Sequence, residues 1–245
     1  MKRLCIITLA IVCLGTNKQA YAEIRNGYDY EIEKAEKWLR QLHQIANGPL
    51  NELESEKMKN KLEEAHTTVD KLRENHTKTQ ELIEMLRRVA PELYHEMHTI
   101  QDCEGNETHI YIKVVDRLGK GLHGATNVKH SDDNPNVYTS AYGDHTVSVR
   151  IDHVNLLKDL WCLVHELGHV RYQVPHLAEY AVFYKKVYLN QHFTGIHGHH
   201  PDDPSAFSVQ ETVKTFKKSW REYNKETKKG GQNKSREILV SIREN

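Results

Sequence analysis

The first third of the chain shows apolar residues at the spacing of an α-helix. Over residues 28–98 they recur every three or four positions, which places them on one helix face. The repeat is broken at Asn47-Gly48-Pro49, a sequence typical of a turn. Asn51, followed three residues later by Glu54, predicts a capping box at the start of a second helix. A helix, a break and a long helix together predict an antiparallel hairpin.

The second helix is long and carries a coiled-coil-like seam. Its seam positions alternate between spacings of four and three residues, at Met58, Leu62, Ala65, Val69, Leu72, His76, Thr79, Ile83 and Leu86. Pro91 restarts a short helix that ends near Ile100. We assign residues 23–100 to a helical hairpin arm. It serves either as a brace packed on the rest of the protein or as a surface that binds a partner.

After residue 100 the repeat changes to the period of two that is typical of strands. Four segments rich in β-branched and aromatic residues are separated by turn sequences, at 108–115, 123–128, 137–140 and 145–151. Helical patterns follow at 153–172, 177–192 and 209–223. The order predicts an α+β fold, with one domain over residues 101–215. The Lys- and Asn-rich end, residues 216–245, is predicted to be a mobile tail.

The first 22 residues have the features of a signal peptide. Lys2 and Arg3 precede an apolar run of about eleven residues, which is too short to span a bilayer as an anchor. Ala20-Tyr21-Ala22 is a small-x-small cleavage pattern. We therefore expect a secreted or periplasmic protein that begins at Glu23, with no membrane span after signal removal.

The net charge limits the classes of partner, and the cysteine content limits the disulfides that the protein can form. The 34 Lys and Arg residues balance the 34 Asp and Glu residues, so no net positive charge favours nucleic acid or an anionic membrane. The mature chain keeps only Cys103 and Cys162, too few for a disulfide framework. The composition is unusual in its 17 histidines, which raises the question of metal binding.

The strongest chemical signal is His165-Glu166-Leu167-Gly168-His169, an H-E-x-x-H sequence on a predicted helix. Residues four apart lie one turn apart on one helix face, so two imidazoles at this spacing can converge on one Zn²⁺. Zn²⁺ lowers the pKa of a bound water to about 7. Glu166, next to the first ligand, is placed to act as the general base on that water. Gly168 costs helix stability and predicts a close backbone approach.

With its apolar flanks Val164 and Val170, this heptapeptide resembles the active-site helix of the zincin metallopeptidases. The resemblance implies a small mixed sheet whose edge strand holds an extended peptide or protein substrate. Segments 137–140 and 145–151 occupy the expected places of the edge strand and its neighbour. It further implies a zinc ion, hydrolysis of peptide bonds, and a third ligand from the helical part that follows. Tyr172 and Pro175 stand where the metzincin subgroup needs Gly and His, which excludes that subgroup.

The third ligand has several candidates. The gluzincin pattern places a Glu on the next helix, and Glu179 returns level with His169 if the chain turns at Val174-Pro175. We therefore predict zinc ligands His165, His169 and Glu179. Alternatives are His199, His176, His200, Asp202 and Glu211.

Two other functions stay open. The protein could be a non-catalytic zinc protein with a zincin-like shell, or a metal buffer that uses the histidine tract at 192–200. It could also be an interaction protein whose helical hairpin does the work.

Overall fold

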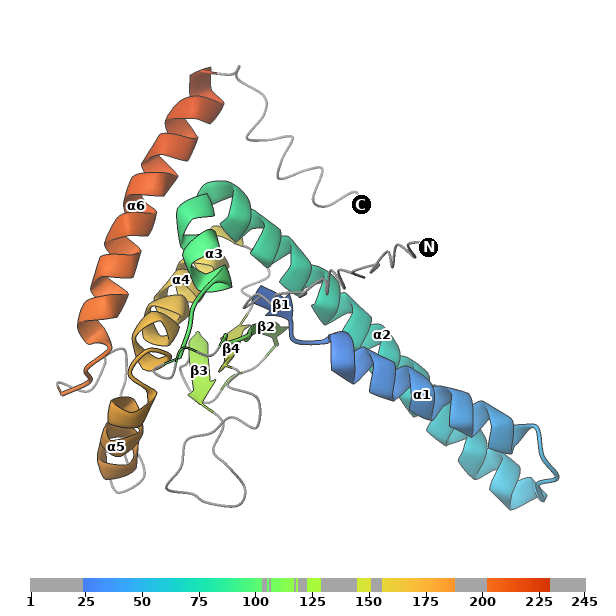
Figure 1. Ribbon diagram of the computed structural model, residues 1–245. Coiled ribbons are helices and arrows are strands. Elements are labelled where there is room, and N and C mark those ends of the chain that lie inside the picture. Colours follow the sequence, from blue (N-terminus) through green and yellow to red (C-terminus); the bar gives the residue numbers. More distant parts are fainter. Residues whose placement is uncertain are drawn as a thin grey trace, which may run out of the picture.

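The computed structural model describes residues 24–102, 105, 107–116, 118, 123–128, 145–150, 156–187 and 202–229. Their helices and strands follow in the order β1 (Ile24–Asn26), α1 (Asp29–Ala46), α2 (Glu52–Val89), α3 (Pro91–His98), β2 (Ile110–Val115), β3 (Gly124–Val128), β4 (His145–Arg150), α4 (Leu156–Gln173), α5 (Leu177–Val187) and α6 (Ala206–Lys229). The predicted α+β class is confirmed, with helices outweighing one small sheet (Figure 1).

Helices α1 and α2 form the predicted hairpin (Figure 1). Its capping box is present, because Glu54 N donates to Asn51 Oδ1 at 2.9 Å and Asn51 N donates to Glu54 Oε2 at 3.0 Å. Arg73 Nη2 lies 2.7 Å from Glu36 Oε1, and His76 Nε2 lies 2.9 Å from Asp29 Oδ1. From Arg73 to His76 the contacts advance along α2 while their partners move back along α1 from Glu36 to Asp29, as an antiparallel pair requires.

The base of the hairpin belongs to the same core as the rest of the described protein. In the second half of α2, Leu82, Ile83 and Leu86 are buried in one cluster with residues of β2 and α4. The outer part differs, since Trp38, Ile45 and Leu53 are exposed. This cluster thus includes residues from both sides of the boundary predicted near residue 101.

The sheet has the strand order β1-β2-β4-β3. β1 pairs parallel with β2, β2 pairs parallel with β4, and β3 pairs antiparallel with β4. The pairs Ile112↔Val147 and Thr126↔Val147 fix the register across the middle. Strand β1 was not expected from the sequence. Among the described strands, β1 and β3 stand at the two edges. The segment expected at an edge, residues 137–140, lies outside the described residues.

Helix α4 lies between the sheet and α6 (Figure 1), and its buried face is an apolar stripe: Leu160, Leu163, Val164, Leu167 and Val170. The close approach predicted at Gly168 is confirmed, because a Cβ there would lie 2.6 Å from the Cα of Val209 on α6. α4 is therefore held on two sides, by the sheet and by α6.

The tail predicted from residue 216 needs a correction. Helix α6 continues to Lys229, and Phe216 is fully buried in the core. Val213, Trp220 and Tyr223 also pack against that core, at the three- and four-residue spacing of one helix face. The apolar stripe of the helix thus continues through the Lys-rich sequence. Residues 230–245 lie outside the described residues.

None of the helices in the described ranges combines the length and the apolar character that a membrane crossing requires. The predicted signal peptide, residues 1–22, lies outside those ranges.

Candidate functional site

His165 and His169 lie one turn apart on α4, as the spacing predicts, and both are half-buried. Their ring centroids are 5.3 Å apart and their planes are inclined at 64°. A ring bound to zinc at about 2.0–2.1 Å has its centroid roughly 3.2 Å from the metal, so two such rings at a near-tetrahedral angle lie about 5 Å apart. The observed separation therefore fits two imidazoles that share one ion.

Glu166 is buried, with 8% of its surface exposed, and its carboxylate faces the edge strand β3. Thr126 Oγ1 donates to Glu166 Oε2 at 2.8 Å and lies 3.3 Å from the backbone carbonyl oxygen of the same residue. A charged group in such a place is costly unless it is hydrogen bonded. The threonine hydroxyl therefore both satisfies and orients the carboxylate.

Gly124, at the start of β3, is needed for this arrangement. A Cβ at Gly124 would lie 2.6 Å from Glu166 Oε1 and 2.7 Å from its Cγ. Atoms in ordinary van der Waals contact are farther apart than these distances by close to an ångström. The absent side chain leaves room for Oε1, so Gly124 and Thr126 together define where the carboxylate lies.

His169 is held by a short chain of hydrogen bonds from the loop before α6. Its Nδ1 lies 2.5 Å from Ser205 Oγ. The hydroxyl of Ser205 donates to Asp203 Oδ1 at 2.7 Å, and the backbone N–H of Ser205 donates to the same oxygen at 2.9 Å. Asp203 and Ser205 are both buried. A metal bound by the His169 ring would accordingly be bound through Nε2.

The predicted third ligand, Glu179, is not brought to the two histidines. It lies in the first turn of α5, and its side chain is 73% exposed. Its Oε2 accepts from the hydroxyl of Tyr172 at 3.5 Å and lies 3.8 Å from His176 Nδ1. Burial, aided by the nearby carboxylate, raises the pKa of Tyr172. The chain turns as expected after α4, but the carboxylate faces Tyr172 and His176 instead of the H-E-x-x-H motif.

The structure describes three of the five alternative third ligands. His176 is exposed beside Glu179, Asp202 is exposed, and Glu211 lies 3.4 Å from Lys214 on α6. The histidine tract lies outside the described residues: His192, His197, His199 and His200.

The donor set can be tested against a catalytic zinc ion. Two imidazoles at a suitable separation and an adjacent carboxylate fit two ligands and a base. Within the part of the chain that the structure describes, no three His, Cys, Asp or Glu side chains are grouped so that they could hold a metal. A catalytic zinc ion normally has three protein ligands. The residues present thus fit the first two ligands and the base.

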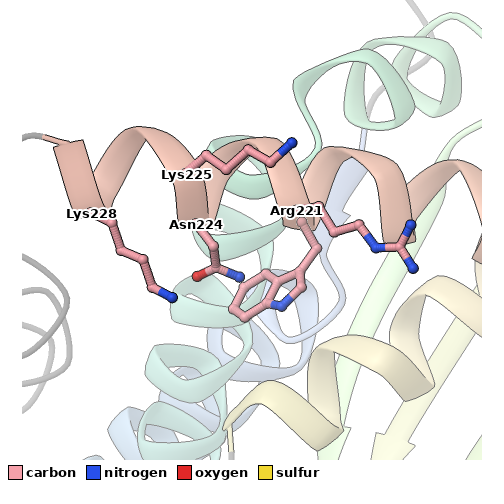
Figure 2. Close-up of a pocket in the computed structure, with 5 residues that line it drawn as sticks. Arg221, Asn224, Lys225 and Lys228 are labelled. Atoms are coloured by element: carbon pink, nitrogen blue, oxygen red, sulfur yellow. The ribbon is translucent and has the colours of Figure 1, made fainter.

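A separate shallow pocket lies on α6. It has a volume of about 300 Å³ and is lined by Trp220, Arg221, Asn224, Lys225 and Lys228. Figure 2 shows the labelled side chains projecting from this one helix. At 1.5 Å per residue, even Trp220 lies about 22 Å along the axis from Ser205. The pocket is therefore not part of the H-E-x-x-H site, and exposed cations of this kind bind anions weakly.

Four residues of the site did not emerge from the sequence: Gly124, Thr126, Asp203 and Ser205. Asp203-Pro204-Ser205 before an apolar-periodic segment is a recognisable helix start. That signal places a helix, but it does not reveal that the serine reaches His169. Nothing local marks Gly124 and Thr126 as partners of a glutamate 40 or more residues away.

Comparison of the chain with models of protein families, with curated proteins and with solved structures found no match in any of the three.

Proposed function

We propose that this protein is an exported zinc metallopeptidase that hydrolyses peptide bonds with an activated water. One observation carries the proposal: His165 and His169 present their rings at the separation that a shared ion needs, while Glu166 is buried beside them and fixed by Thr126. Burying a carboxylate beside two half-buried imidazoles on one helix turn is costly in a protein that makes no use of them. The arrangement supports a site built for metal-assisted hydrolysis.

Each residue of the motif has one role in this proposal. His165 and His169 hold the ion, and His169 does so through Nε2 because Nδ1 is engaged by Ser205. When bound, Zn²⁺ supplies Lewis acidity and makes hydroxide accessible near neutral pH. Glu166 takes a proton from the attacking water and passes it to the leaving amine. Thr126, which donates to Oε2 at 2.8 Å, holds the carboxylate in place for this transfer.

The position of β3 supports a proposal for the substrate class. This strand is one of the two edge strands of the described sheet, and the Glu166 carboxylate lies against it. An edge strand offers backbone N–H and C=O groups to an extended peptide, which adds to the sheet as a further strand. We therefore propose that a peptide or protein substrate binds in extended form along Gly124–Val128. This segment takes the role that we expected for residues 137–140.

The test separates metal binding from chemistry. The purified protein is incubated with a mixture of unstructured peptides, new termini are identified by mass spectrometry, and zinc per chain is measured. Glu166→Gln keeps the shape of the side chain but removes the base. We expect it to retain the zinc content of the wild type and to lose about 10²–10⁴-fold in rate. Glu222→Gln, an exposed change on α6, is the matched control and keeps full activity.

The outcomes discriminate between the candidate functions. Cleavage by Glu166→Gln at the wild-type rate would contradict the mechanism. One tightly held ion per chain without hydrolysis by the wild type would favour the non-catalytic zinc protein. Several weakly held ions would favour the metal buffer. Removal of the ion by a chelator, with activity restored by added zinc, supports the peptidase.

A further inference from the structure

We propose that Ser205 and Asp203 are positioning residues that hold His169 in the tautomer with its proton on Nδ1, which leaves the lone pair of Nε2 as the donor to a metal. The inference deepens the proposed function and rests on it where the metal is concerned. The tautomer itself is a property of the metal-free chain. Both residues lie in the loop just before α6, 34 and 36 positions beyond the histidine in the sequence.

The tautomer follows from counting protons along the chain of hydrogen bonds. A serine hydroxyl has one proton to donate. Ser205 Oγ donates to Asp203 Oδ1 at 2.7 Å, and the same oxygen accepts from the backbone N–H of Ser205, as an unprotonated carboxyl oxygen does. Towards His169 Nδ1, 2.5 Å away, Oγ must therefore act as acceptor. The proton in that bond belongs to Nδ1.

Burial and backbone hydrogen bonds hold Asp203 and Ser205 in place next to His169. Ser205 is fully buried and Asp203 is 5% exposed, so water does not compete strongly for either group. The backbone N–H of Ser205 also donates to Asp203 Oδ1, at 2.9 Å, and fixes the carboxylate relative to the hydroxyl. Val209 N donates to Ser205 O at 3.0 Å in the first turn of α6. The serine is therefore fixed at the helix start.

The packing of α6 on α4 fixes the position of Ser205 relative to His169. Val209 lies against the backbone of Gly168, the residue immediately before the histidine. The aromatic rings of Trp161 on α4 and Phe216 on α6 meet edge to face, with centroids 4.6 Å apart. The hydroxyl acceptor and the imidazole are thus held by two helices in firm contact. Such partners fix both the tautomer and the ring orientation of metal-binding histidines, and their loss typically costs 10–100-fold in metal affinity.

The experiment reads the tautomer without metal or activity. The full chain is labelled with ¹⁵N-histidine, stripped of metal and examined by NMR, where protonated and unprotonated ring nitrogens have distinct shifts. A His169→Gln variant identifies the His169 signals. We expect a protonated Nδ1 and an unprotonated Nε2 in the wild type. Ser205→Ala should give a mixed or reversed tautomer, and Ser205→Thr, which keeps the hydroxyl, should restore the wild-type pattern.

Zinc affinity, measured by competition with a chelating dye, is the second readout. We expect Ser205→Ala to weaken binding about 10–100-fold and Ser205→Thr to bind within about threefold of wild type. Ser208→Ala, in the same helix turn, is the matched control and should change neither readout. Circular dichroism checks that each variant is folded.

Two results would overturn the proposal: a wild-type His169 with its proton on Nε2, or a folded Ser205→Ala that keeps both the wild-type tautomer and its zinc affinity. A wild type with the proton on Nδ1 that binds no zinc would support the tautomer assignment and contradict the peptidase. The two claims therefore fail in distinguishable ways.

Discussion

Replacing Gly168 with alanine tests how closely α6 packs on the helix that carries the candidate site. A Cβ at this position would lie 2.6 Å from the Cα of Val209 and 3.2 Å from its Cγ2. Carbon atoms in contact are about 3.5–4.0 Å apart, so the helices would have to separate locally by roughly 1 Å. The nearest obstacle is backbone, which cannot move away as the end of a flexible side chain can.

Three effects, one stabilising and two destabilising, decide the size of the change. Alanine is better than glycine in a helix interior by about 1 kcal/mol. Overpacking a closely packed contact costs about 1–3 kcal/mol. Separation of the helices also weakens the edge-to-face contact between Trp161 and Phe216, a kind of contact worth about 0.5–1.5 kcal/mol. We expect the free energy of unfolding to fall by about 1–2 kcal/mol, or roughly 2–8 °C in Tm.

Urea unfolding followed by circular dichroism measures this free energy. Gln210→Ala, an exposed change next to Val209, is the control and should stay within about 0.5 kcal/mol of wild type. If Gly168→Ala instead stabilised the protein by about 1 kcal/mol, as helix propensity alone predicts, the close contact between α4 and α6 would be refuted.

Two further predictions concern the metal site and the response to alkali. Glu179→Ala should leave zinc content and peptide hydrolysis unchanged, because the carboxylate lies with Tyr172 and His176; a loss of zinc in metal analysis would return Glu179 to the ligand set. Burial raises the pKa of Tyr28 to about 12, and its hydroxyl donates to Val114 O at 2.6 Å. The stability contributed by the neutral phenol is complete below its ordinary pKa near 10 and is lost as pH rises through 12. Urea midpoints should therefore fall more steeply between about pH 9 and 11.5 for wild type than for Tyr28→Phe, and equal slopes would contradict the shift.

The helices were predictable because their signals are local. The 4-3 seam, the turn at Asn47-Gly48-Pro49 and the capping box at Asn51 all lie within a few residues of the feature they determine. Strand β1 has only three residues and exists because it pairs with β2, more than 80 positions later in the chain. A segment of that length carries no repeat that could have been read. The pattern predicted a helix over 209–223, and α6 spans Ala206–Lys229. Its last residues, 224–229, include no apolar residue that could mark them as part of the helix.

The candidate site likewise has one part that local sequence determines and another that depends on the folded chain. The spacing of His165 and His169 is a property of one helix, and the structure gives the separation that it predicts. The surroundings of Glu166 depend on β3, and those of His169 depend on α6, so both required the folded chain. Glu179 shows the limit of arguing from helix geometry alone. The turn after α4 was anticipated, but the direction of the side chain depends on contacts with Tyr172 and His176.

The insertion of the α1–α2 hairpin between the neighbouring strands β1 and β2 has a consequence for how the protein folds. Asn26 must find Ile112, 86 positions away in the chain. Once the hairpin has formed, the side-chain amide of Asn26 donates to His76 O at 2.8 Å. The loop that remains to be closed then runs from His76 to Ile112, which are 36 positions apart. By the logarithmic dependence of closure entropy on length, this shortening is worth about 0.8 kcal/mol, roughly a fourfold gain in the chance of a productive encounter. A hairpin that forms early would thus hold the first strand of the sheet close to the strand with which it pairs.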